Sequence, residues 1–246
     1  MPEGGESTLR LSFTMNKDRV NTILKYTRAV LFFFGLPALV FIVAGTFKWW
    51  QAWVYIGFSY AASITSRALI TKVHPDLVQE RVNYKDKADA KKWDGFLMPL
   101  VALISPAAYF ITAALDKRFG WSSAVPLWLY IVALIITIAF YALSAWALVT
   151  NRFFSAVARI QADRGQTVVD SGPYRYIRHP GYLAGIMVGL FFPPMMGSWW
   201  AFIPVGIMVI AIIIRTALED KMLINELPGY KEYTQKTRFR LLPGIW

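Results

Sequence analysis

The sequence contains no cysteine and only two histidines, His74 and His179. Disulfide bonds, thiolate metal ligands and a cysteine nucleophile are therefore excluded, and no metal site is expected. Charged residues are also scarce: they make up 17% of the 246 residues, whereas a soluble domain has about a quarter. Together with a hydrophobic content of 56%, this deficit predicts an integral membrane protein.

Long apolar stretches alternate with polar segments, and a membrane-spanning helix needs about 20 apolar residues. The first four stretches are long enough to span a bilayer individually. The fifth ends in Pro193-Pro194, where a helix rarely continues, and with the sixth it predicts a tight helical hairpin around Met196-Gly197-Ser198. We therefore predict an all-α, polytopic helical bundle with about six transmembrane helices, five being the alternative. The stretches are 28–47, 50–70, 96–115, 125–150, 182–196 and 199–215.

The formal net charge of +11 would suggest nucleic acid as a partner in a soluble protein. Here the charges lie between apolar runs, which favours loops facing anionic membrane lipids and no nucleic acid. With six spans, 23 of the 26 lysines and arginines fall on one side, leaving Lys48, Lys117 and Arg118 on the other. The positive-inside rule then places both termini in the cytoplasm.

The chain accordingly divides into three parts. Residues 1–27 are expected to form a cytoplasmic N-terminal tail, and residues 28–150 four transmembrane helices. Residues 151–246 contain the C-terminal helical hairpin, a cytoplasmic tail and most of the polar residues that can carry chemistry. A functional site is therefore expected at the cytoplasmic face, formed by the C-terminal third.

The segment from Gln161 to Gly185 contains the first candidate site. Proline is favoured in the first turn of a helix, so Pro180 predicts that His179 lies at a helix N-terminus. Such an end has free backbone donors and a positive dipole end that suit a carboxylate or phosphate. Tyr182 follows three residues later on the same helical face.

A second candidate site follows the last apolar stretch. Arg215 is the first charged residue after that stretch, and Glu219 follows four residues later on the same helical face. The two side chains form either a surface ion pair of little energetic value or a functional pair. In the functional interpretation, one residue serves an anionic substrate and the other a cationic cofactor.

Taken in order, these residues resemble the signature of isoprenylcysteine carboxyl methyltransferases and their prokaryotic relatives. Phospholipid N-methyltransferases share a looser version of it. The resemblance covers residues from about Asn151 to Trp246. The matching elements are Gly172-Pro173-Tyr174, Arg178-His179-Pro180-x-Tyr182, Arg215-x-x-x-Glu219-Asp220, Gly229-Tyr230-x-x-Tyr233 and Leu242-Pro243-Gly244-Ile245.

The resemblance implies S-adenosyl-L-methionine as the cofactor, bound at the cytoplasmic face. It implies catalytic roles for Arg215 and Glu219, and substrate binding by Arg215 and Asn151. Two departures from the family pattern are Gln166, where a histidine is common, and Asp220, where a second glutamate is usual. The implied cofactor-binding residues are Gln161, Gln166, Thr167, Val168, Val169, Tyr174, His179, Pro180, Gly181, Tyr182 and Glu219.

The expected reaction is O-methylation of the carboxylate of an isoprenylcysteine-like or other lipophilic substrate drawn from the bilayer. A carboxylate needs no strong base, so catalysis would rest on positioning and electrostatics. The alternative of N-methylation of a phospholipid or other amine needs an acid–base residue such as Glu219 or Asp220. The sequence leaves open the choice between these acceptors, the role of the first four spans and the oligomeric state.

Two other classes fit the residues less well. Sterol-type reductases, which bind NADPH, have a similar C-terminal pattern. Their pattern contains a Trp-rich Gly-Trp-Trp-Gly stretch, however, where this chain has Gly172-Pro173-Tyr174. A transporter or scaffold would be expected to carry ionisable residues at mid-bilayer. None of the six apolar stretches has an Asp, Glu, Lys or His near its centre.

Overall fold

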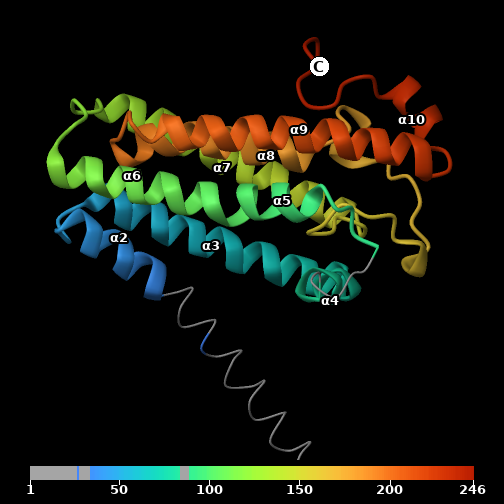
Figure 1. The fold of residues 1–246 in the computed structure, drawn as a ribbon, viewed down its shortest axis with the longest axis horizontal. Helices are drawn as coiled ribbons and strands as arrows, with labels where there is room; N and C mark the ends of the chain where they lie inside the picture. Colours follow the sequence, from blue (N-terminus) through green and yellow to red (C-terminus); the bar gives the residue numbers. More distant parts are fainter. Residues whose placement is uncertain (1–26, 28–33, 84–88) are drawn as a thin grey trace, which may run out of the picture.

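The apolar stretches of the chain fold as helices that lie side by side (Figure 1). The computed structural model describes Thr27, residues 34–83 and residues 89–246. The predicted N-terminal tail, apart from Thr27, and the start of the first apolar stretch lie outside these residues. The described residues contain no β-strand. The helices are α2 (Leu36–Ala44), α3 (Trp50–Val73), α4 (Pro75–Val82), α5 (Asp94–Pro99), the π-helix η3 (Leu100–Ile104), α6 (Ser105–Phe119), α7 (Leu127–Thr150), α8 (Pro180–Met196), α9 (Phe202–Glu226) and α10 (Tyr230–Lys236), with short 3₁₀ turns η4 (Ala162–Arg164) and η5 (Gly172–Arg175).

Three of these helices are long and apolar enough to cross a membrane. Within the described residues they are Asp94–Phe119, which runs without a break through α5, η3 and α6, then α7, and α9; α8 is apolar but shorter. The outer face of α9 supports the membrane prediction, because Ile203, Ile207 and Ile210 are each at least half exposed. The prediction of an integral, all-helical membrane protein is confirmed, whereas the count of six spans stays a prediction.

Helix α8 is the most enclosed element of the bundle. It packs against α7 along its length and also contacts α3 and α9. Phe192 and Met195 on this helix are fully buried, and the ring of Phe192 packs against those of Tyr55 and Tyr109. These contacts join the C-terminal hairpin to helices from the N-terminal half.

The expectation that a helix does not continue through Pro193-Pro194 was wrong. Helix α8 continues through both prolines to Met196 and ends at Gly197, which has a left-handed φ of 72°. Each proline lacks the N–H that would donate to the carbonyl four residues earlier, so the last turn of α8 forms without these two intrahelical hydrogen bonds. The adjacent buried side chains of Phe192 and Met195 hold this turn in place. The hairpin around Gly197 is where it was predicted.

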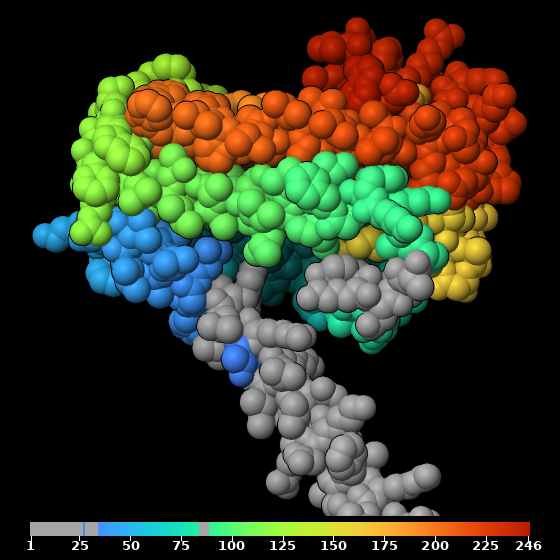
Figure 2. Space-filling view, viewed as in Figure 1, coloured from blue at the N-terminus to red at the C-terminus, as the bar shows by residue number. Residues whose placement is uncertain are grey.

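The ends of the bundle differ in character. At one end, short turns connect α2 to α3, α6 to α7, and α8 to α9 (Figure 1). The buried carboxylate of Asp116 joins two of these turns, because it accepts hydrogen bonds from the hydroxyls of Ser122 and Ser198. The other end carries α4, the long 151–179 segment and α10, which make a thicker cap on the bundle (Figure 2).

Gly172 sets how closely that cap approaches α7. Its φ is +55°, and a Cβ atom there would lie 2.8 Å from the hydroxyl oxygen of Thr150 and 3.2 Å from the indole nitrogen of Trp146. A non-glycine residue would therefore meet both backbone strain and a steric clash. This contact places η5, and with it Tyr174, beside the end of α7.

We predict that Gly172→Ala destabilises the protein more than Gly165→Ala. Gly165 also has a positive φ, of 60°, but a Cβ atom added there would have no neighbour within 4 Å. Its substitution therefore costs only the backbone strain of about 1–2 kcal/mol. The apparent Tm of each variant in detergent measures the difference. Equal losses of Tm in the two variants would contradict the role of the Thr150 contact.

Candidate active site

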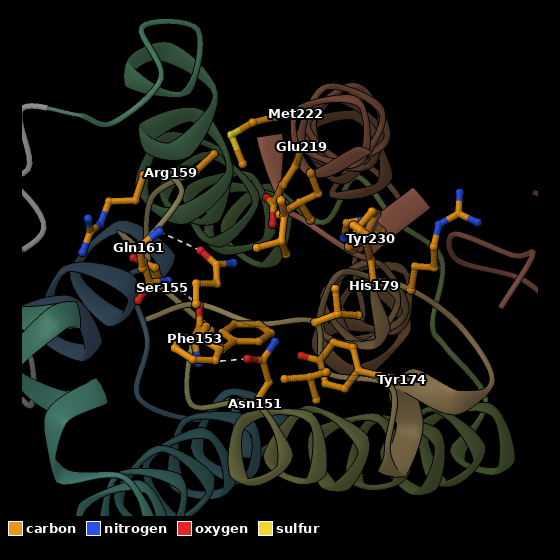
Figure 3. A pocket seen from close by; sticks show the side chains of 18 of the residues that line it. Asn151, Phe153, Ser155, Arg159, Gln161, Tyr174, His179, Glu219, Met222 and Tyr230 are labelled. Carbon is orange, nitrogen blue, oxygen red and sulfur yellow. Dashed lines mark hydrogen bonds between the residues drawn. The ribbon is translucent and has the colours of Figure 1, made fainter. Parts of the chain in front are cut away.

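A pocket opens at the capped end of the bundle, where α7 ends and α8 begins. It encloses about 780 Å³ of space, part of it open to solvent. Its walls come from the 151–179 segment, the first turns of α8, the second half of α9 and α10. Figure 3 shows Glu219 and Met222 on one side of this space and Asn151 and Tyr174 on the opposite side.

Nearly all the predicted site residues line this one pocket. The exception is Pro180, which is buried and begins α8 without lining the space. The predicted residues found in the lining are Asn151, Gln161, Gln166, Thr167, Val168, Val169, Tyr174, His179, Gly181, Tyr182, Arg215 and Glu219.

Other lining residues were missed by the sequence analysis. Met222 and Leu223 follow Glu219 at helical spacing, so the face of α9 that carries Glu219 indicates them. The residues after Asn151 are in a non-helical segment, and no periodicity identifies them. The lining residues that were given no role in the site are Phe153, Phe154, Ser155, Val157, Ala158, Arg159, Arg178, Met222, Leu223, Leu227, Tyr230 and Tyr233. Of these, Arg178, Tyr230 and Tyr233 had been identified only as elements of the family motif.

Tyr182 is the centre of a group of polar side chains in the pocket. Its hydroxyl donates a hydrogen bond to the carboxylate of Glu219. The ring of His179 stacks on the tyrosine ring with centroids 5.6 Å apart, and the guanidinium carbon of Arg215 lies 5.3 Å from the tyrosine centroid. Within the described residues, Glu219 forms no ion pair, so its negative charge remains available to a ligand.

Arg215 is held by a residue from the N-terminal half of the chain. Its Nε and one Nη donate to the two carboxylate oxygens of Asp94 at 2.6 and 2.9 Å, and the same Nη also donates to the carbonyl of Ala156. Asp94, at the start of α5, is 1% exposed and also accepts from the backbone N–H of Ala158. The substrate binding implied for Arg215 therefore cannot use this edge of the guanidinium.

A second buried carboxylate, Asp220, is surrounded by donors. Arg178 donates to both of its oxygens at 2.8 Å, Arg240 donates to one at 2.8 Å, and Tyr230 donates at 3.1 Å. Nε2 of His179 lies 3.3 Å from the same carboxylate, and must carry the proton in this contact because a carboxylate only accepts. Burial, and then the charge of Asp220, raise the pKa of Tyr230, which keeps its hydroxyl a donor.

The two predicted glutamines shape the pocket wall. The side-chain amide of Gln161 donates to the carbonyl of Phe153 at 2.6 Å, and its oxygen accepts from Arg164. The side-chain oxygen of Gln166 accepts from the backbone N–H of Gln161 at 2.7 Å. Most of the polar capacity of Gln161 is thus used within the protein, and its contribution to a ligand is limited to what its remaining N–H can donate.

The N-terminus of α8 faces the pocket beside Gly181. No side chain caps this end, as was expected from the position of Pro180. A Cβ atom on Gly181 would lie 2.4 Å from the ring of Phe154. The ring of Phe154 therefore packs against this glycine and closes one side of the pocket.

Apolar helices with exposed isoleucines, and a pocket with an unpaired carboxylate beside stacked aromatic rings, define an integral membrane protein with a small-molecule site. Residues 131–225 match the model of the isoprenylcysteine carboxyl methyltransferase (ICMT) family, which supports a relation of this segment to that family of methyltransferases. No curated protein matches the chain. The matched segment includes α8, most of α7 and nearly all of α9, but not Asp94 or α10.

We predict that Asp220→Asn destabilises the protein by about 3–5 kcal/mol, because it leaves the buried guanidinium of Arg178 without its counter-ion. Arg240 should also lose its contact with residue 220 and become more accessible, so trypsin should cleave the C-terminal tail faster. The matched control is Glu226→Gln on the same helix, which removes a partly exposed ion pair with Lys91 worth at most about 1 kcal/mol. An unchanged Tm and an unchanged rate of cleavage in Asp220→Asn would contradict the central role of this carboxylate.

Proposed function

We propose that the protein is an S-adenosyl-L-methionine-dependent methyltransferase that O-methylates the carboxylate of an isoprenylcysteine-like or other lipophilic substrate. The observation that carries this proposal is the convergence of Glu219, Tyr182, His179 and the α8 N-terminus on one pocket. Those residues all lie in the segment that matches the methyltransferase family.

The lining residues fit the groups of this cofactor. The unpaired carboxylate of Glu219 suits an ammonium group or ribose hydroxyls. The ring of Tyr174, which lines the pocket, attracts a sulfonium as aromatic rings attract other cations. The uncapped α8 N-terminus suits the carboxylate of the amino-acid part.

The proposed reaction requires the protein mainly to orient the reactants. When bound, the cofactor supplies an electrophilic methyl group on a positively charged sulfur. An acceptor carboxylate is already the nucleophile, so no residue needs to remove a proton from it. The task of the chain is to align the two reactants and to keep water out. Phe154 and Tyr182 serve this purpose as apolar walls next to the polar ones.

The acceptor's lipid part is proposed to stay in the bilayer. Arg215 lies where the apolar run of α9 meets the pocket, and the exposed side chains of Ile210 and Ile214 precede it on the helix. A lipophilic molecule lying along this surface would bring its polar end to Arg215 and Tyr182. We further propose that this end of the bundle faces the cytoplasm with both termini, because it carries most of the basic residues.

We predict that Glu219→Gln weakens S-adenosyl-L-methionine binding by about 10- to 100-fold, or about 1.5–3 kcal/mol, the usual value of a hydrogen bond to a charged group. Glutamine keeps an acceptor for the Tyr182 hydroxyl, so the fold should be unchanged. Isothermal titration of the detergent-solubilised protein measures the affinity, with Glu226→Gln as the control on the same helix. Equal affinity in Glu219→Gln and wild type would reject this cofactor site, and competition by NADPH would favour a reductase.

We predict a methyl ester as the product. Membranes or purified protein supplied with a farnesylated cysteine and radiolabelled cofactor should give a labelled lipid that releases methanol in mild base, because esters hydrolyse under these conditions and N-methyl groups do not. A base-stable labelled lipid would move the function to methylation of an amine. Glu219→Gln serves as the reduced-activity control in the same assay.

A further inference from the structure

Arg81, on α4, reaches the wall of the pocket from outside the segment that matches the family. One Nη of its guanidinium donates to the carbonyl of Phe154 at 3.1 Å, and the guanidinium carbon lies 5.6 Å from the centre of the Phe154 ring. The same ring lines the pocket and closes against Gly181. A side chain of the N-terminal half is thus attached directly to the pocket wall.

Arg81 differs from the other arginines around the pocket in having no counter-ion. Arg159 pairs with Glu80, Arg178 with Asp220, and Arg215 with Asp94. In the part of the chain that the structure describes, no carboxylate forms an ion pair with Arg81. Burial, and then the positive charge of Arg215, lower the pKa of Arg81. These are the effects expected of a cation that lacks a compensating charge.

The donors that Arg81 leaves unused have a defined geometry. The contact with Phe154 occupies one Nη. The Nε and the other Nη remain, and together they form an edge of the guanidinium that makes bidentate contacts with carboxylates. In contrast, the corresponding Nε–Nη edge of Arg215 is occupied by Asp94. The charge of Arg215 is balanced by Asp94, whereas Arg81 forms no ion pair with a carboxylate of the described residues.

We infer that Arg81 binds the anionic group of the lipophilic acceptor, next to Arg215 and Tyr182. This inference rests on the proposed function, and it names the charged group that selects a carboxylate over a neutral or cationic acceptor. A half-buried guanidinium without a counter-ion is costly to hold, and an incoming carboxylate would relieve that cost. A phospholipid phosphate shares the same chemistry, but the attachment of Arg81 to the pocket wall through Phe154 favours the acceptor.

The test compares a ligand with and without its charge. Binding of a farnesylated cysteine carboxylate and of its carboxamide is measured on detergent-solubilised wild type and on Arg81→Gln. The wild type should prefer the carboxylate by about 10- to 100-fold, the range expected for a charge-assisted hydrogen bond. Arg81→Gln should lose this preference, while its affinity for the carboxamide and for S-adenosyl-L-methionine stays within about twofold of wild type.

Two further variants complete the design. Arg67→Gln removes an exposed arginine in the C-terminal half of α3, the helix that precedes α4, and should keep the full preference for the carboxylate. Arg81→Lys keeps the charge without the bidentate geometry, and should show an intermediate preference. The Tm of each variant is measured alongside, so that a folding defect is seen directly.

The outcomes separate this inference from the proposed function. Full preference for the carboxylate in Arg81→Gln would overturn the inference, and so would a wild type that binds both ligands equally. Arg81→Gln could instead keep the preference for the carboxylate and lose only the binding to vesicles that depends on anionic phospholipid. In that case Arg81 is a lipid contact and the inference is wrong. A wild type that binds no S-adenosyl-L-methionine would reject the proposed function, whereas a preference for the carboxylate that depends on Arg81 would still support this acceptor site.

Discussion

The bidentate contact between Arg178 and Asp220 is the interaction on which the pocket depends. It joins the segment before α8 to the C-terminal part of α9, and both residues are buried. Arg178 also donates to the carbonyls of Thr237 and Arg238, so the C-terminal tail folds over the same contact. Buried ion pairs rarely add net stability, but their removal is costly because one charge is left behind. The pair therefore acts mainly to fix three segments in one arrangement.

A second buried ion pair, formed by Asp94, fixes the N-terminal half in the same way. That carboxylate binds Arg215 on α9 and the backbone of Ala158 in the pocket wall. The N-terminal helices thereby contribute to the site although the family match begins at residue 131. Paired arginines hold the shape of the pocket in this arrangement, and the groups left unpaired, Glu219 and Arg81, are the ones able to meet charged ligands.

The features that could be predicted from the sequence depend on local chemistry. Pro180 marked the start of α8, and the spacing of Arg215 and Glu219 placed both on one face of α9. The helix across Pro193-Pro194 was mispredicted, because the buried packing around it outweighs the preference of the two prolines. The charge partners could not be predicted either. Arg215 and Asp94 are 121 residues apart in the chain, and no periodicity links them, so only the folded bundle brings them together.

The shortness of α8 bears on where a lipid substrate can react. Its 17 residues span about 25 Å, whereas the hydrocarbon core of a bilayer is roughly 30 Å thick. If the Gly197 end were placed at one membrane interface, the end that carries His179 would lie below the level of the opposite headgroups. A lipid whose polar end lies at the membrane surface would therefore need to sink by only a few ångströms, and would not have to leave the membrane, to reach the pocket.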